Sequence, residues 1–135
     1  MLKLGDVFIN RNPGSPDRLW AVASDSGGVG EVVIYMIEPI LKRECDLTCV
    51  IEPHEHPSVR RRSFVNYEAG RVLSEAMQEA LFRLALCDLQ EPASPALIAR
   101  IQDGALTSDF TPQKQQKIIV ESRTPKPVGG QQPGP

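Results

Sequence analysis

The chain has 135 residues, a length that fits one domain with a hydrophobic core of its own. A hydrophobic fraction of 41% and a charged fraction of 24% are ordinary for a globular protein, and the formal net charge of −2 argues against a general nucleic-acid or membrane-surface binder while leaving room for a local basic patch. No run of about 18 apolar residues occurs, and the N-terminus lacks the apolar segment of a signal peptide, so we expect a cytoplasmic protein without a membrane span.

The first third of the chain reads as short β-strands separated by turns. Residues 6–10, 19–24 and 31–37 are rich in apolar and β-branched side chains, and clusters of Gly, Pro, Asn and Ser at 12–16 and 26–30 interrupt them. The glycine-rich link at 26–30 predicts a hairpin. The run at 31–37 is almost continuously apolar, which predicts a central, buried strand.

Further strands are predicted at residues 46–51, 63–67 and 71–73. No helical pattern fits before residue 74, so a parallel α/β layout is excluded. Strands at this spacing predict a mainly β fold, either a small barrel or a strongly bent sheet, followed by helices.

The hydrophobic period becomes helical at Ser74, a good N-cap. One face of this first helix is predicted to carry the apolar side chains of Ala76, Met77, Ala80, Leu81, Leu84 and Ala85. Ser94 followed by Pro95 opens a second helix that ends at Gly104, and Thr111 followed by Pro112 opens a third.

The end of the chain is rich in Pro, Gly, Gln and Lys and has no hydrophobic anchor. Such a segment does not offset its ordering entropy and is predicted to be disordered. We therefore expect one globular domain over residues 1–121, with the barrel at about 1–73 and the helices at about 74–121, and a disordered tail over 122–135.

The only two histidines, His54 and His56, lie in a loop downstream of Cys45 and Cys49. These four side chains are of the types that bind zinc, but a Cys-x3-Cys pair on a strand spans about 13 Å, too far for two ligands of one ion. Three cysteines are also too few and too uneven for a disulfide framework. We therefore predict no metal and no cofactor, with the cysteines in the core and the histidines in a solvated loop.

A basic run, Arg60, Arg61 and Arg62, enters the strand that begins at Ser63. One interpretation is a solvated strand edge, where arginines discourage aggregation. The other is a phosphate site, because guanidinium groups bind phosphate oxygens in pairs. If the segment were extended, Arg60 and Arg62 would share one face, so two of the three arginines would converge on one anion.

Four segments of the chain also follow the order of strands in one known family. Residues 3–7 (Lys-Leu-Gly-Asp-Val) match an opening Gly-Asp strand, residues 18–24 match an Arg-Pro-x-Leu-Val-Val strand, and residues 46–51 occupy the place of a fourth strand. Residues 62–73 resemble an Asp-Ser-x-Val-x-x-x-Gln-x-Arg-Thr-Ile segment. On these motifs the chain resembles the PemK/MazF-like toxins of type II toxin–antitoxin systems.

The resemblance implies an SH3-like barrel, a homodimer, and a metal-independent endoribonuclease that acts on single-stranded RNA and is neutralised by an antitoxin protein. It also implies that Arg18 is a catalytic arginine and that Arg71 assists it. Glu38, or a histidine of the loop with His54 and His56, would then be the base. Arg60, Arg61, Arg62 and Ser63, together with the two histidines, would bind the substrate.

Two departures from the family pattern favour another hypothesis. Leu19 stands where the family usually has proline, and Glu38-Pro39-Ile40 offers no hydroxyl where the family often places a catalytic Thr or Ser. The alternative function is therefore a non-catalytic SH3-like barrel that binds a partner protein or nucleic acid.

Overall fold

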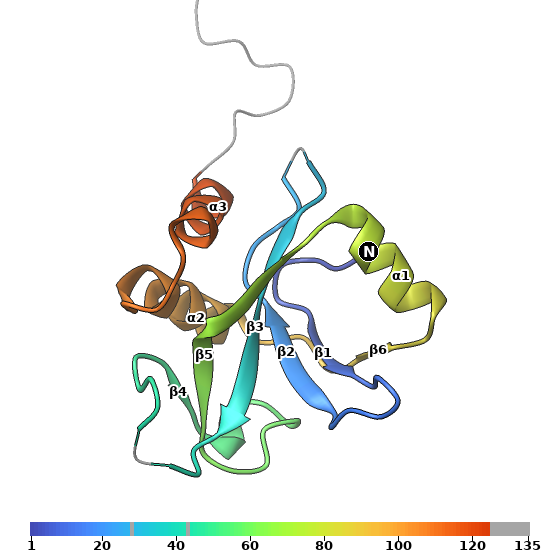
Figure 1. Cartoon of the computed structure of the whole chain (residues 1–135). Coiled ribbons are helices and arrows are strands. Elements are labelled where there is room, and N and C mark those ends of the chain that lie inside the picture. The colour runs from blue at the N-terminus through green and yellow to red at the C-terminus, as the bar shows by residue number, and fades with distance from the viewer. Residues whose placement is uncertain (28, 43, 125–135) are drawn as a thin grey trace, which may run out of the picture.

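The computed structural model describes residues 1–27, 29–42 and 44–124, which form one antiparallel sheet and three α-helices (Figure 1). The strands are β1 (Val7–Asn10), β2 (Arg18–Val22), β3 (Val32–Pro39), β4 (Val50–Ile51), β5 (Ser63–Leu73) and β6 (Cys87–Leu89). The helices are α1 (Glu75–Arg83), α2 (Pro95–Thr107) and α3 (Gln113–Arg123), with a 3-10 turn η1 (Pro53–Glu55) before β5.

The strands are ordered β4-β5-β3-β2-β1-β6, and every neighbouring pair is antiparallel. The hairpin between β2 and β3 and the interior position of β3 are confirmed. The mainly β fold with C-terminal helices is confirmed as well. The sheet, however, stays open: β4 and β6 are its two edges, so the described strands do not close into the barrel that the sequence predicted.

Three strand predictions need correction. The strand expected at 46–51 shrinks to β4, because Asp46 accepts a hydrogen bond from the backbone N–H of Thr48 and folds that segment into a turn. The runs at 63–67 and 71–73 belong to one long strand, β5. The edge strand β6, which pairs with β1, was not predicted because its three residues carry no alternating pattern.

The helix starts are mostly as expected. The hydroxyls of Ser74 and Ser94 accept hydrogen bonds from the backbone N–H groups three residues onward, at 3.2 and 3.1 Å. Thr111, in contrast, does not cap α3; the N-cap is Pro112, without a side-chain hydrogen bond. Helix α2 does not end at Gly104 but continues to Thr107. The glycine lies inside the helix because a Cβ atom there would clash with the hydroxyl of Tyr67.

The apolar face predicted for α1 is partly wrong. Met77 and Leu84 are exposed, whereas Gln78 is fully buried. The Gln78 side-chain amide donates to the carbonyls of Gly30 and Leu73 and accepts from the backbone N–H of Leu2. Burial of a polar side chain is tolerated here because each of its polar atoms has a partner. The third helix extends to Arg123, past the boundary expected at 121, and the rest of the expected tail, 125–135, lies outside the described residues.

The two faces of the sheet are covered unequally (Figure 1). Helices α2 and α3 cover one face, where the larger core contains the rings of Tyr35 and Tyr67 and the α2 residues Leu97, Ile98 and Ile101. Helix α1 covers only one end of the other face, above a smaller cluster. That cluster consists of Leu2, Phe8, Trp20, Val22, Val32, Ile34 and Leu73, packed against Leu81 and Phe82. No helix of the described ranges covers the remainder of this second face, which we call the open face (Figure 1).

A large bulge interrupts the pairing of β3 with β5. Met36 pairs with Asn66 and Ile34 pairs with Arg71, so the single residue Tyr35 lies opposite four residues, 67–70, of β5. Asn66 and Arg71 are five positions apart and would point to opposite faces of a regular strand. The bulge cancels that alternation and leaves both residues paired with neighbours on the open face.

The two core tyrosines give a matched test of this packing. Their rings meet edge to face at 4.8 Å; the Tyr67 hydroxyl donates to the carbonyl of Ile101 at 2.8 Å, whereas the buried Tyr35 hydroxyl has no partner among the described residues. Tyr67→Phe should therefore lower the free energy of unfolding by about 1 kcal/mol, and Tyr35→Phe should leave it unchanged or raise it slightly. Urea denaturation measures both, and an equal loss in the two variants would contradict the assignment.

Candidate functional site

Three of the residues expected to act in catalysis lie on the open face. Glu38 is two residues from Met36 along β3, and Arg18 is two residues from Trp20 along β2, so each shares the face of its neighbour. Arg71 joins them through the β5 bulge. Three segments that are far apart in the sequence therefore present their charges on one surface.

The carboxylate of Glu38 is held from two sides. Arg18 Nη1 lies 3.8 Å from one carboxylate oxygen, and Asn66 Nδ2 donates to the other at 2.5 Å. The side chains of Arg18 and Glu38 are 49% and 26% exposed. A loose and partly exposed ion pair of this kind contributes little to stability, about 0–1 kcal/mol. Folding therefore does not depend on it.

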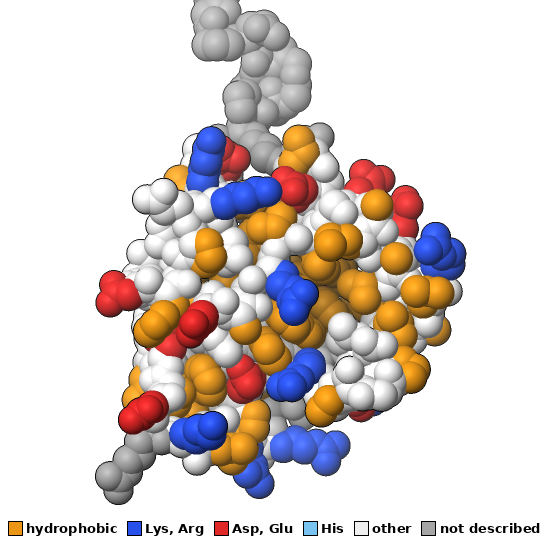
Figure 2. Space-filling view, in the orientation of Figure 1, with side chains coloured by type: hydrophobic (Ala, Val, Ile, Leu, Met, Phe, Trp, Pro, Cys, Tyr) orange, Lys and Arg blue, Asp and Glu red, His pale blue; other side chains and the backbone are white. Residues whose placement is uncertain are grey.

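Two hollows on this face meet at Arg18. A hollow of about 470 Å³ is lined by Arg18 and Arg71 over a floor that includes Trp20 and Leu81, with Asn10, Asn12 and Ser15 at its rim. A second hollow of about 330 Å³ is lined by Arg18, Glu38, Arg60, Arg61 and Ser63. Arg18 and Met36 line both, so the two hollows adjoin, and we call them together the arginine groove. Figure 2 shows basic side chains over the middle of the sheet and at its lower end.

The basic run contributes two arginines to the groove, but not the expected pair. Arg60 and Arg61 line the second hollow, whereas Arg62 turns away and forms an ion pair with Glu52 at 2.8 Å. Residues 60–62 precede β5 and belong to no strand, with a bend at Arg61, so strand alternation does not apply to them. Ser63 is buried and its hydroxyl donates to the carbonyl of Arg61, which fixes the entry into β5.

Neither histidine lines the groove. His54 is exposed on η1. His56 is buried, and its Nδ1 accepts from the backbone N–H of Ser58 at 3.0 Å while its Nε2 lies 2.6 Å from the carbonyl of Glu91. Because Nδ1 accepts, the proton is on Nε2 and is donated to that carbonyl. Both ring nitrogens of His56 are thus occupied, and it ties its loop to the chain before α2 rather than serving as a base.

The cysteines and histidines do not gather into a metal site. Within the described ranges, no group of three or more His, Cys, Asp or Glu side chains could hold a metal ion, and all three cysteines are free thiols. Cys49 is buried, which raises its pKa. Nor does any helix in these ranges have the length and apolar character to cross a bilayer.

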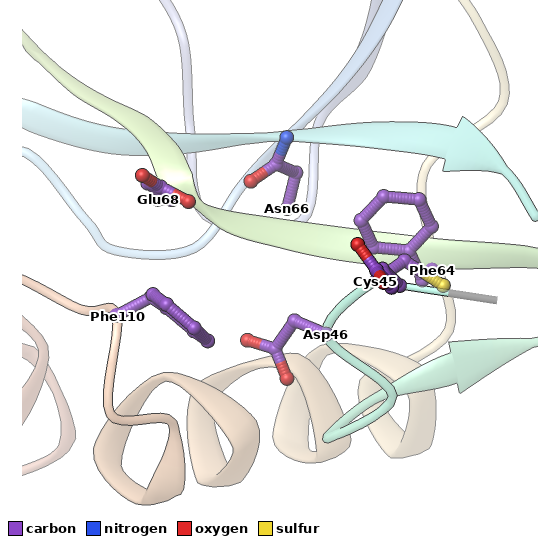
Figure 3. Close-up of a pocket in the computed structure, with 7 residues that line it drawn as sticks. Cys45, Asp46, Phe64, Asn66, Glu68 and Phe110 are labelled. Carbon is purple, nitrogen blue, oxygen red and sulfur yellow. The ribbon is translucent and has the colours of Figure 1, made fainter. Parts of the chain in front are cut away.

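Beyond Asn66, an acidic pocket bounds the arginine groove. It has a volume of about 400 Å³ and contains the carboxylates of Glu44, Asp46 and Glu68 and the rings of Phe64 and Phe110 (Figure 3). Burial alone would raise the pKa of Asp46, but hydrogen bonds from Ser108 and Thr48 outweigh it and hold the pKa below its ordinary value. Asp46 is therefore ionised at neutral pH, and an anionic ligand in the groove would be repelled from this side.

Several residues of the groove were missed by sequence reasoning. Asn10, Asn12, Ser15 and Trp20 line the larger hollow, and Asn66 contacts Glu38. In a sequence, a segment rich in Asn, Ser and Pro is interpreted as a turn between strands, and a tryptophan in a strand is interpreted as a core residue. The pairing of β1 with β2 places Asn10 opposite Arg18, and the pairing of β3 with β5 places Asn66 opposite Met36.

Comparison with models of known protein families gives no match for this chain, and comparison with curated proteins gives none either.

The histidines allow a paired stability test. His56→Ala removes two hydrogen bonds from a buried side chain and should lower the free energy of unfolding by about 2–3 kcal/mol. His54→Ala changes an exposed residue and should stay within about 0.5 kcal/mol of the wild type. Denaturant unfolding of the two variants checks the assignment, which similar losses would refute.

Thiol labelling provides a pH test. Burial, with help from Asp6 and Asp88, raises the pKa of Cys87 to about 11. Because the thiolate is the reactive form, labelling of Cys87 with iodoacetamide should be slow at pH 8 and accelerate about tenfold per pH unit up to pH 10. Peptide mass spectrometry follows the site, Cys87→Ser is the control, and circular dichroism verifies that the fold persists. A rate that levels off below pH 9 would contradict the raised pKa.

Proposed function

We propose that this protein is an endoribonuclease of the PemK/MazF-like kind that cleaves single-stranded RNA in the arginine groove without a metal ion. The observation that carries the proposal is the gathering of Arg18, Glu38 and Arg71 on the open face, from three separate strands. The resemblance of four strand segments to that family singled out Arg18 and Arg71, and Glu38 was one of the candidate bases beside the two histidines.

The charges of the groove suit an RNA backbone. Arg18, Arg60 and Arg61 line one hollow, and Arg18 and Arg71 line the next, so phosphates would meet guanidinium groups along the groove. Two carboxylates line the groove: Asp17, which forms an ion pair with Arg11 at 2.7 Å, and Glu38, the base of the proposed reaction. The other carboxylates near it belong to the acidic pocket, whose lining shares no residue with either hollow. Single-stranded RNA also offers unstacked bases, which the apolar floor with Trp20 would accommodate.

The reaction proposed is an internal transfer of the phosphate. Glu38 takes the proton of a ribose 2′-hydroxyl, and the 2′-oxygen attacks the adjacent phosphorus. The bond from phosphorus to the 5′-oxygen breaks, and the leaving oxygen gains a proton from water. The hydroxide that remains takes the proton from Glu38 and restores the base, and the products end in a 2′,3′-cyclic phosphate and a 5′-hydroxyl. Arg18 and Arg71 stabilise the negative charge that develops on the phosphate oxygens.

The proposal extends to the fold and the partners. Strands β1 to β5 would correspond to an SH3-like barrel that remains open at β4, and α2 and α3 would be additions to the minimal family fold. By the same resemblance, the protein would act in the cytoplasm as a homodimer and would be neutralised by an antitoxin protein.

A second function is favoured by one specific observation. One carboxylate oxygen of Glu38 already accepts a hydrogen bond from Asn66, the other faces Arg18 at 3.8 Å, and residues 39 and 40 supply no hydroxyl. A groove in which the base is held in this way would bind RNA or a partner protein without cutting. This non-catalytic module predicts a stable RNA complex with intact RNA.

The test is cleavage of a 5′-labelled, unstructured RNA of mixed sequence in the presence of EDTA. Arg18→Ala and Glu38→Gln should each reduce kcat/KM about 100-fold, because they remove charge stabilisation and the base. Arg83→Ala, which removes an exposed arginine of α1, should leave the rate within twofold of the wild type. Intact RNA with the wild-type chain, or equal rates for the Arg18 and Arg83 variants, would refute the nuclease. Binding without cleavage would establish the second function instead.

A further inference from the structure

We infer that Asn66 is the positioning residue of the arginine groove: one end of its amide orients Glu38, and the other end holds the bulge that brings Arg71 to the open face. This inference rests on the proposed function for its catalytic consequence. Its geometric part stands on the contacts alone.

The first contact aims the carboxylate. Asn66 Nδ2 donates to Glu38 Oε2 at 2.5 Å, and Arg18 Nη1 lies 3.8 Å from Glu38 Oε1. A glutamate side chain has several rotatable bonds, so a partly exposed one samples many rotamers unless neighbours restrain it. The short hydrogen bond from the amide is the stronger restraint of the two, since the arginine contact exceeds hydrogen-bond distance.

The second contact lies within β5. Asn66 Oδ1 accepts from the backbone N–H of Ala69 at 3.1 Å, a local side-chain bond that closes the turn of the bulge. The next pairing residue after the bulge is Arg71, opposite Ile34. A shift of one residue in this segment would move the side chain of Arg71 to the other face. The bond to Ala69 therefore acts on the location of Arg71.

The amide of Asn66 makes both contacts from one side chain. The carboxylate of Glu38 requires a donor, and the N–H of Ala69 requires an acceptor, so the two ends of the amide cannot be exchanged. Aspartate would keep the acceptor for Ala69 and place a second negative charge against Glu38. Alanine would remove both contacts. These two substitutions therefore separate the role toward Glu38 from the role toward Arg71.

The experiment compares four variants with the wild type: Asn66→Asp, Asn66→Ala, Glu38→Gln, and the double variant Asn66→Asp/Glu38→Gln. Gln113→Glu, which adds a negative charge at an exposed position of α3, is the matched control. For each protein, kcat and KM are measured on the labelled RNA, and Tm is measured by circular dichroism.

For Asn66→Asp we expect kcat to fall about tenfold or more with KM within threefold of the wild type, because Arg71 stays in place while Glu38 is displaced. Asn66→Ala should in addition raise KM about tenfold. Asn66→Asp should lower Tm by about 4 °C. The double variant should regain most of that loss, because the amide introduced at position 38 would donate a hydrogen bond to the carboxylate introduced at position 66. The double variant should regain no activity, because it lacks the base.

Two results would overturn the inference. Equal kcat and Tm for Asn66→Asp and Gln113→Glu would show that Asn66 does not orient Glu38. An unchanged backbone amide resonance of Ala69 in Asn66→Ala, measured by NMR, would show that it does not hold the bulge. If the wild-type chain cleaves no RNA, the proposed function is refuted but the inference about Asn66 is not. The recovery of Tm in the double variant then still tests the contact with Glu38, and the Ala69 resonance still tests the contact within β5.

Discussion

The structure depends on one close contact between β3 and β5. A Cβ atom on Gly70 would overlap the ring of Tyr35 and would also come within 2.6 Å of Oε1 of Gln115, so only glycine allows β5 to pass here. Opposite this ring, four residues of β5, 67–70, face the single residue Tyr35. Tyr67, the first of them, points into the larger core as Val65 does, and its hydroxyl donates to the carbonyl of Ile101 in α2. The bulge also breaks the regular alternation of side chains along β5, so that Arg71 lies on the open face together with Asn66.

The distribution of charge follows from which face each element covers. Helices α2 and α3 cover the face with the larger core, so the opposite face is free to carry arginines. Glu52 and Glu55 pair with Arg62 and Arg100 away from the groove, which leaves Arg60 and Arg61 to line it. A chain with a net charge of −2 thereby presents a local basic depression, with the carboxylates of the acidic pocket collected on the far side of Asn66.

The sequence predicted the elements that depend on local signals. Periodicity and breakers identified β1, β2, β3 and the β2–β3 hairpin, and the hydroxyl caps of α1 and α2 were confirmed. What it could not predict depends on contacts between distant residues: the open sheet, the three-residue edge strand β6, and burial of Gln78 by partners at Leu2 and Gly30. The residues of the candidate site likewise include some that the sequence predicted and some that it could not. Arg18, Glu38 and Arg71 were named as candidates, but Asn66 could be found only after the bulge had defined its neighbours, and His56 proved to be a structural side chain.

Glu38 shows how binding and catalysis would compete in this groove. Asn66 Nδ2 donates to one carboxylate oxygen at 2.5 Å, whereas Arg18 Nη1 lies 3.8 Å from the other, beyond hydrogen-bond distance. Asn66 therefore occupies one oxygen, and the oxygen beside Arg18 is the one that would accept a proton from a ribose. An incoming phosphate would compete with Glu38 for Arg18, because a guanidinium group binds either anion. A shift of Arg18 toward the phosphate would move its charge away from the carboxylate oxygen that faces it, while Asn66 kept the other oxygen in place. Substrate binding would thus convert an ion pair of small energetic value into a free base and a bound phosphate, side by side on the open face.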